Sequence, residues 1–328
     1  MIKLNNNIED LTLYLKSKDW LTNNESIVAV EKPGDGNMNF TLRITTETRS
    51  FIVKQSREYV EKYPQVAAPE DRVLMEAKFY KIIEKVPNLK EMMPTLIGLD
   101  KANNVMVMND LGNGSDFTYL YQLGKQFLEE DLYAVVDFAA TLHTSITVHT
   151  QEDRITNTKM RALNHEHIFN YPYVLNNGIN LDDILPGLQK EAERFKTDEP
   201  LKKAVKELGD LYLQDGNTLL HGDYFPGSWL ATVQGLKVID PEFCFFGKPE
   251  FEIGVLLAHL KMANQANTLI EKAVDRYKSL ADLDTVLCYK FMGIEILRRI
   301  IGLAQLPLEI NLEKRVKLLN EARKILVN

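Results

Sequence analysis

The sequence predicts an α+β protein with two lobes: a small β-rich N-terminal lobe and a larger, mainly helical C-terminal lobe. Segments rich in β-branched and aromatic residues cluster within residues 27–55. From residue 129 onward, segments with helical spacing of apolar residues predominate. At 328 residues the chain is long enough to bury two cores. We place the boundary within the strand-like segment 105–111, which gives lobes of residues 1–110 and 111–328.

The composition is that of a globular protein, with 45% hydrophobic and 26% charged residues. The formal net charge of −7 argues against a nucleic-acid partner, which would need a basic face. Cys244 and Cys288 stand among apolar neighbours, so we expect buried, reduced thiols and a cytoplasmic protein. The apolar stretch FMGIEILRRIIGLAQL is interrupted by two arginines, so we expect no membrane span.

The N-terminal lobe begins with three expected strands within residues 27–55, joined by the turns GDGN and TETR. A helix follows at 69–86, with a proline and two acidic residues at its start, and then the buried strand at 105–111. The segment NHEHIFNYPYVLNNG, residues 164–178, is predicted to be an irregular loop. The helices predicted in the C-terminal lobe are 129–146, 200–214, 251–265, 284–304 and 308–326.

The turn between the first two strands consists of glycine, aspartate and asparagine, the usual turn formers. A calcium-binding loop is excluded, because its glycine position would hold Phe40 and its closing glutamate position Thr46. A turn between two strands can also lie over the phosphates of a nucleotide, although this one is not G-x-G-x-x-G. The residues concerned are Gly34, Asp35, Gly36, Asn37 and Asn39.

Lys54 ends the apolar strand FIVK, and Glu76 lies in the helix predicted at 69–86. Taken alone, a lysine at a strand end is usually a surface residue. The ordered combination of turn, strand lysine, helix glutamate and following strand is less common. In protein kinases, such a lysine is paired with a helix glutamate and holds the nucleotide's phosphates. We therefore interpret Lys54 and Glu76 as a nucleotide-binding pair.

Two predicted loops of the C-terminal lobe give the strongest indication of a catalytic and metal-binding site. In LLHGDYFPGSWL, Asp223 stands where protein kinases have the aspartate that accepts the substrate hydroxyl proton, and Ser228 stands where they have a metal-binding asparagine. In LKVIDPEF, Asp240 ends an apolar strand, and Glu242 can face the same side two residues later. Magnesium commonly binds one or two carboxylates together with phosphate oxygens. We therefore expect Glu242 to supply the metal oxygen that Ser228 cannot, with Ser228 as a weaker or indirect ligand.

These motifs resemble the aminoglycoside-phosphotransferase/choline-kinase superfamily, and within it the 5-methylthioribose kinases, which have a bilobal protein-kinase-like fold. Three features are narrower than the shared HGD loop: GDGNMN, a serine in place of the metal asparagine with DPEF after it, and LRRIIGLAQ. The resemblance implies that Asp223 is the catalytic base and that Asp240 and Glu242 hold Mg²⁺. It also implies that ATP binds to the nucleotide loop, to Lys54 with Glu76, and to a hinge at Asn109, Asp110 and Leu111.

The resemblance further places Arg298 and Arg299 at the substrate site with Asp223. Consecutive helical residues point about 100° apart, so we expect the two arginines not to share one direction and at least one to reach the acceptor site. The alternative is that one pairs with an acidic residue of the same lobe and the other is solvated. One departure from the resemblance concerns Glu252, which replaces an aspartate that usually braces the catalytic loop.

The sequence therefore predicts a kinase that uses ATP and Mg²⁺ to phosphorylate a hydroxyl of a small sugar, with 5-methylthioribose as the favoured acceptor. The first alternative is an aminoglycoside- or choline-type phosphotransferase that acts on another small alcohol. The second is a nucleotide-binding pseudoenzyme that serves as a partner-binding module, which would require a broken catalytic set. We expect no nucleic-acid or membrane partner, and a homodimer stays open.

Overall fold

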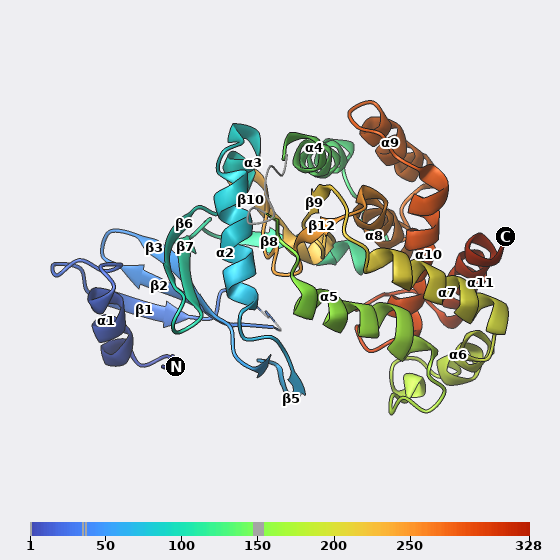
Figure 1. The fold of residues 1–328 in the computed structure, drawn as a ribbon, viewed down its shortest axis with the longest axis horizontal. Coiled ribbons are helices and arrows are strands. Elements are labelled where there is room, and N and C mark those ends of the chain that lie inside the picture. The colour runs from blue at the N-terminus through green and yellow to red at the C-terminus, as the bar shows by residue number, and fades with distance from the viewer. Residues whose placement is uncertain (1, 35, 37, 147–153) are drawn as a thin grey trace.

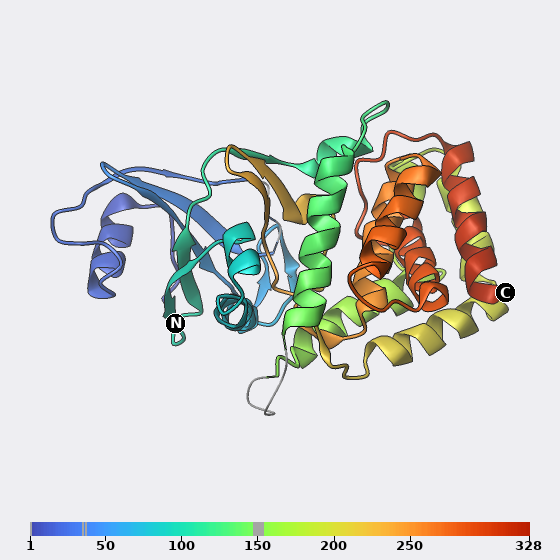
Figure 2. The same ribbon diagram turned by 90° about the horizontal axis from the view of Figure 1, so that it is seen from above.

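The computed structural model of the protein describes residues 2–34, 36, 38–146 and 154–328. The chain folds into a β-rich N-terminal lobe and a mainly helical C-terminal lobe, as the sequence predicts (Figure 1). Seen from above, helix α4 (Glu129–Ser145) runs along the side of the helical lobe that faces the N-terminal lobe (Figure 2). At this junction Asp240 contacts Lys54 of the N-terminal lobe.

The N-terminal lobe is built around one antiparallel sheet with strand order β1–β2–β3–β7–β6. Consecutive strand residues face opposite sides of a sheet. In β7, Val107 therefore packs with α1 (Ile8–Ser17), whereas Met108 packs in the core that includes α2 (Arg72–Ile83). The strands are β1 (Ile27–Glu31), β2 (Phe40–Thr46), β3 (Ser50–Gln55), β6 (Leu96–Asp100) and β7 (Val105–Asn109).

After β7 the chain leaves this sheet. Strand β8 (Gly114–Asp116) pairs with β10 (Trp229–Thr232), which pairs in turn with β11 (Gly235–Val238). A second short pair joins β9 (Thr218–Leu220) to β12 (Phe245–Gly247). The loops that follow β9 and β11 carry the two motifs that the sequence singles out.

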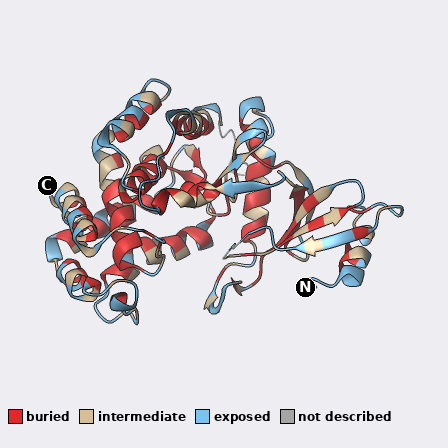
Figure 3. Cartoon of the chain, turned by 180° about the vertical axis from the view of Figure 1, so that it is seen from behind, coloured by how far each residue is buried: buried red, intermediate tan, exposed pale blue. Residues whose placement is uncertain are grey.

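Helices α8 (Pro249–Met262) and α10 (Thr285–Ile301) form the buried centre of the C-terminal lobe, where red predominates in Figure 3. Every residue from 291 to 301 is buried, including three charged ones. Such burial requires partners for those charges, because an unpaired charge in a protein interior is costly. In the described part of this lobe the other helices are α4, α5 (Thr158–His165), α6 (Leu188–Lys196), α7 (Glu199–Tyr212), α9 (Asn267–Lys278) and α11 (Leu312–Val327), whereas α3 (Pro87–Met92) follows α2 in the N-terminal lobe.

The helices and strands predicted from the sequence are confirmed, with ends shifted by a few residues. The irregular loop predicted at 164–178 is wrong in its first part, because Glu166–Asn170 forms a π-helical turn and Tyr171–Tyr173 a 3₁₀ turn. Burial of Ile168 and Phe169 in the core favours these turns despite the Asn- and Pro-rich sequence. The other short elements are β4 (Tyr59–Val60), β5 (Tyr63–Ala67), η1 (Phe117–Tyr121), η4 (Leu181–Asp183) and η5 (Pro226–Ser228).

None of the helices in the described part of the chain is both long enough and apolar enough to cross a membrane.

Gly222, in the loop after β9, occupies a position where a side chain does not fit. Its φ is +86°, and a Cβ there would lie 2.1 Å from the carbonyl oxygen of Phe243. Gly235 also has a positive φ, +92°, but open space surrounds it. Gly235→Ala should therefore lower the free energy of unfolding by about 1–2 kcal/mol through backbone strain. Gly222→Ala should lower it by more, because the loop must also move.

Urea denaturation of the two variants tests this expectation. Equal losses of unfolding free energy for Gly222→Ala and Gly235→Ala would contradict it, since the two differ in the space around the added methyl group.

Candidate active site

Lys54, on β3, forms a buried ion pair with Glu76 of α2. Its Nζ lies 2.9 Å from Oε1 and 2.8 Å from Oε2 of Glu76, and it also contacts the carboxylate of Asp240. Burial opposes the charge on Lys54, but Asp240, Glu76 and Glu242 outweigh this effect and raise its pKa. The side chain is therefore a firmly charged ammonium that joins β3, α2 and the loop after β11.

The loop after β11 presents two carboxylates in different surroundings. Asp240 has a positive φ of 63°, and its side chain is 49% exposed. Glu242 is buried and accepts a 2.8 Å hydrogen bond from the side-chain amide of Asn39, while Nε of Arg72 lies 3.7 Å from the same oxygen. Burial raises the pKa of Glu242, and Lys54 and Arg72 oppose this shift. Glu242 thus links LKVIDPEF, the predicted metal loop, to the predicted nucleotide loop.

The donors in this region suit a hard cation such as Mg²⁺, which prefers oxygen ligands. Asp240 and Glu242 supply carboxylate oxygens, and Ser228 is held nearby because its carbonyl accepts a 2.9 Å hydrogen bond from the backbone N–H of Ile239. Within the described residues, no group of three or more His, Cys, Asp or Glu side chains is arranged to hold a metal. A magnesium ion here would therefore need further oxygens, such as those of phosphate.

The loop that carries Asp223 is fixed through its backbone. Glu252 of α8 accepts hydrogen bonds from the backbone N–H of His221 at 3.1 Å and of Gly222 at 2.8 Å. The hydroxyl of Ser228 donates to the carbonyl of Asp223 at 2.7 Å. Nε2 of His221 lies 2.8 Å from the carbonyl oxygen of Ile239, the residue before Asp240. The catalytic-loop and metal-loop motifs are thus held side by side.

Arg298 and Arg299 both lie beside Asp223, so the expectation that they point in different directions is wrong. Their Nη2 atoms are 3.8 and 3.5 Å from Oδ1 of Asp223. Glu295, one helical turn earlier on α10, draws them together by accepting from Nε of Arg298 at 2.6 Å and from Nε of Arg299 at 2.7 Å. A helix fixes the direction of each Cβ, but the long arginine side chains can still converge on a shared partner.

Burial and the neighbouring charges have opposite effects on the pKa of Asp223. Burial raises the pKa of the Asp223 carboxyl, whereas Arg299 and Arg298 act to lower it. Glu295 is also buried, but the two arginines hold its pKa well below its ordinary value. Glu295 is therefore a carboxylate that balances part of the charge of the arginine pair.

Glu295 was missed by the sequence prediction, and so were its neighbours. Nε2 of His259 lies 3.0 Å from Oε1 of Glu295, and Nδ1 of His259 lies 2.6 Å from the hydroxyl of Tyr121. A signal for Glu295 does exist in the sequence, since it is the lone acidic residue before two arginines in an apolar helix. The sequence holds no comparable signal for Tyr121, which lies far from α10 in the chain.

The predicted nucleotide loop is described only in part, because Asp35 and Asn37 lie outside the described residues. Open space surrounds the positions that a Cβ would take at Gly34 and Gly36. Asn39 is buried against Glu242. Among the described residues of this loop, Asn39 is thus in contact with the predicted metal loop, LKVIDPEF.

The predicted hinge begins at Asn109, the last residue of β7, and two of its side chains have structural partners. Oδ1 of Asn109 accepts a hydrogen bond from the backbone N–H of Thr95. The Asp110 carboxylate lies 2.8 Å from Nε of Arg43 and accepts a 2.8 Å hydrogen bond from Ser50. These side chains hold the hinge in place, and Leu111 follows them, partly buried.

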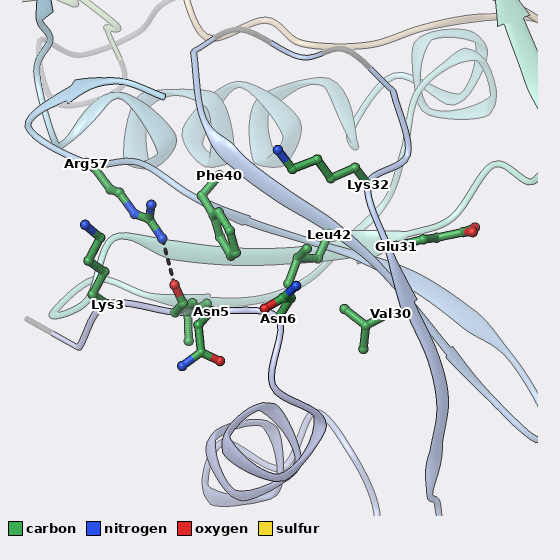
Figure 4. Close-up of a pocket in the computed structure, with 10 residues that line it drawn as sticks. Lys3, Asn5, Asn6, Val30, Glu31, Lys32, Phe40, Leu42 and Arg57 are labelled. Atoms are coloured by element: carbon green, nitrogen blue, oxygen red, sulfur yellow. Dashed lines mark hydrogen bonds between the residues drawn. The ribbon is translucent and has the colours of Figure 1, made fainter. Parts of the chain in front are cut away.

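A separate hollow of ≈ 550 Å³ lies on the α1 face of the N-terminal sheet (Figure 4). Leu42 and Phe40 line it, and both pack with the core beneath α1. Lys54 pairs in register with Thr41 and contacts α2 on the other face. Arg57, at the edge of the hollow, donates to the carbonyl oxygen of Leu4. The hollow is therefore distinct from the candidate active site.

Comparison with known proteins finds relatives of similar sequence. A methylthioribose kinase from Exiguobacterium sibiricum is 30% identical over 257 residues, which cover 74% of this chain and 63% of the relative. Methylthioribose kinase 1 from Oryza sativa subsp. japonica is 26% identical over 250 residues, which cover 72% of this chain and 56% of the relative. The aligned part of the chain thus spans less than two thirds of the length of either relative.

Solved structures show the same fold at low sequence identity. A choline kinase from Streptococcus pneumoniae is 12% identical with a TM-score of 0.54, covering 97% of this chain and 98% of that one. The microcompartment-associated aminopropanol kinase is 16% identical with a TM-score of 0.55, covering 97% and 95%. These likenesses confirm the predicted bilobal, kinase-like fold. Residues 29–286 match the family described as phosphotransferase enzymes, and this match over most of the chain shows that the protein belongs to that family.

Proposed function

We propose that this protein is a kinase that uses ATP and Mg²⁺ to phosphorylate a hydroxyl group of a small sugar. The observation that carries the proposal is the joining of three functional groups in one cluster. Lys54 contacts Asp240, and the loop of Asp240 is hydrogen-bonded through Ile239 to the loop of Asp223. A cation that would bind phosphate, a carboxylate that would bind the metal and a candidate base thus belong to one connected cluster, which supports the proposal of phosphoryl transfer.

The nucleotide side of the site would be formed by Lys54 and the two carboxylates after β11. The Lys54 ammonium, fixed by Glu76, would pair with phosphate oxygens of ATP. Mg²⁺, held by Asp240 and Glu242 with Ser228 as an indirect ligand, would neutralise charge on the phosphates. We further propose that the two lobes divide near residue 110. ATP would then lie between the nucleotide loop and the hinge at residues 109–111.

Asp223 would act on the acceptor. It would take the proton of the sugar hydroxyl as that oxygen bonds to the γ-phosphorus and the bond from phosphorus to the ADP oxygen breaks. Burial makes its carboxylate more basic than usual, while Arg298 and Arg299 favour its ionised form. The guanidinium groups could also donate to oxygens of the sugar or of the transferred phosphoryl group.

The favoured acceptor is 5-methylthioribose, because the curated relatives are named methylthioribose kinases. An acceptor of the choline or aminoglycoside type is a cation. The two guanidinium groups beside Asp223 are balanced by the carboxylates of Glu295 and Asp223, so this cluster offers no excess negative charge to attract such a molecule. A pseudoenzyme is disfavoured because Lys54 and Asp223 are both present in fitting surroundings.

We also propose a reducing, cytoplasmic setting, since Cys244 and Cys288 are both free and buried. The chain itself carries the whole proposed set of residues, so the reaction needs no second copy, and a homodimer stays an expectation.

The direct test measures ATP consumption by the purified protein with 5-methylthioribose, ribose, choline and an aminoglycoside as separate acceptors. We expect Mg²⁺-dependent turnover with 5-methylthioribose and a phosphorylated sugar detectable by mass spectrometry. Faster turnover with choline or the aminoglycoside would replace the proposed acceptor, and no turnover with any alcohol would overturn the kinase assignment.

Asp223→Asn should lower kcat by roughly 10² to 10⁴-fold, the usual contribution of a general base. The affinity for ATP should stay within about twofold, because Asp223 lies on the acceptor side. Asp282→Asn, an exposed aspartate-to-asparagine change, serves as the matched control. A kcat above half of the wild-type value for Asp223→Asn would refute its role.

Glu242→Gln should raise the Mg²⁺ concentration needed for half-maximal activity more than Ser228→Ala does. Glutamine keeps an oxygen that can accept from Asn39, so this change isolates the loss of charge. Ser228→Ala removes a hydroxyl that already donates to the carbonyl of Asp223. Magnesium titrations of both variants decide the matter, and a larger shift for Ser228→Ala would show that Glu242 does not replace the missing asparagine.

A further inference from the structure

Two buried sets of side chains in the C-terminal lobe repeat the same order of groups, Tyr–His–Glu. In the first, which we call the loop triplet, the hydroxyl of Tyr277 lies 2.7 Å from Nδ1 of His143, whose Nε2 lies 2.9 Å from Oε1 of Glu252. In the second, the arginine triplet, the corresponding distances are 2.6 Å between Tyr121 and His259 and 3.0 Å between His259 and Glu295.

The two triplets end on different parts of the surroundings of Asp223. Glu252 of the loop triplet accepts from the backbone N–H groups of the residues just before Asp223. Glu295 of the arginine triplet accepts from Nε of Arg298 and of Arg299. One triplet therefore holds the backbone of the catalytic loop, and the other holds the two cations beside the Asp223 side chain.

The hydrogen-bond directions in the arginine triplet follow from burial. Burial lowers the pKa of His259 to about 4, so its imidazole is neutral near pH 7 and carries one N–H. Glu295 is ionised and can only accept, so the N–H of His259 lies on Nε2 and points to Glu295. Nδ1 is then free to accept from the hydroxyl of Tyr121. All donors in the triplet thus point towards the Glu295 carboxylate.

The contact with Glu295 decides which ends of the arginines face Asp223. Because each arginine uses Nε for Glu295, its terminal nitrogens are left for other partners. The Nη2 atoms of Arg298 and Arg299 lie 3.8 and 3.5 Å from Oδ1 of Asp223, which is beyond ordinary hydrogen-bond length. They can therefore still donate to an oxygen that enters beside Asp223.

The packing around the arginine triplet also restricts its movement. The ring of Phe225 lies 5.1 Å from the ring of His259 and 4.9 Å from the guanidinium of Arg299, measured between centres. His259 and Glu295 are both almost completely buried. Arg299 is thus held both by its ion pair and by the ring of Phe225, which belongs to the loop that carries Asp223.

We propose that Glu295 is a positioning residue that aims both arginines at the acceptor beside Asp223, and that His259 and Tyr121 hold Glu295 in place. Its effect on catalysis rests on the proposed kinase function. Loss of the Glu295 charge frees the guanidinium groups to pair directly with Asp223, which withdraws them from the acceptor. The arginine triplet therefore determines how the acceptor is bound, whereas the loop triplet determines the position of the Asp223 backbone.

Steady-state kinetics with matched variants test this assignment. Glu295→Gln should raise KM for the sugar acceptor by about tenfold or more, while KM for ATP stays within about twofold. Tyr121→Phe, a milder change that removes one hydroxyl, should raise the acceptor KM by about two- to threefold. Tyr277→Phe removes the equivalent hydroxyl from the loop triplet and should lower kcat. Its KM for the acceptor should stay within about 1.5-fold of the wild-type value.

A spectroscopic measurement tests the hold of Glu295 on the arginines without any substrate. ¹⁵N–¹H NMR of the wild-type protein should show slowly exchanging Nε–H signals for Arg298 and Arg299, which Glu295→Gln should lose and Tyr277→Phe should keep. Wild-type protein that transfers phosphate to no acceptor would refute the kinase function while these signals still report on Glu295. An unchanged acceptor KM in Glu295→Gln, equal effects of the two tyrosine variants, or retained Nε–H signals in Glu295→Gln would each overturn the positioning role.

Discussion

The ammonium group of Lys54 joins the N-terminal sheet, helix α2 and the loop after β11 at one buried point. A buried charge is tolerated only while its partners stay in place, and removal of one partner typically costs several kcal/mol. Glu76 and Asp240 belong to different lobes, so this requirement fixes the position of the lobes relative to each other. The same requirement keeps the lysine at the end of β3 in the place where a phosphate oxygen could reach it.

The charges around Lys54 and around Asp223 are arranged differently. Around Lys54, the carboxylates of Glu76, Asp240 and Glu242 outnumber the nearby cations. A nucleotide's phosphates would be repelled there unless a divalent cation accompanied them, which gives a physical reason for the proposed use of ATP with Mg²⁺.

Around Asp223, the two arginines face the carboxylates of Glu295 and Asp223, so that cluster is balanced while both carboxylates are ionised. Uptake of a proton by Asp223 would leave the cluster with one excess positive charge. That excess would appear at the moment when phosphoryl oxygens arrive beside the acceptor. In the proposed reaction, the neutral cluster would thus become attractive to anions only as transfer proceeds.

The ordered motifs made much of this site predictable from the sequence. Lys54 and Glu76 could be paired because a strand lysine followed by a helix glutamate is a recognisable order, and the structure confirms their contact. Asp223 and Asp240 could be placed on neighbouring loops for a similar reason. In each case the information lies within short segments whose strand and helix patterns are strong.

The rest could not be predicted because it depends on contacts between distant segments. Asn39 meets Glu242 across 203 positions of the chain. Arg72, at the start of α2, is fully buried and donates to four backbone carbonyl oxygens, among them that of Met38, beside the nucleotide loop. Nothing in the local sequence distinguishes this arginine from a solvated one. The prediction of an irregular loop at 164–178 was partly wrong for the same reason, because the burial of Phe169 depends on the core of the lobe.

The backbone at Asp240 shows how the site combines strain with chemistry. A φ of 63° is unfavourable for a residue with a side chain, by roughly 1–2 kcal/mol, and glycine would relieve it. Glycine would also remove the carboxylate that contacts Lys54. Aspartate is among the non-glycine residues that tolerate this conformation best, because its short polar side chain can bond locally. The backbone bonds of Ile239 to Ser228 and His221 hold the preceding residue, and so the strained conformation persists where the carboxylate is needed.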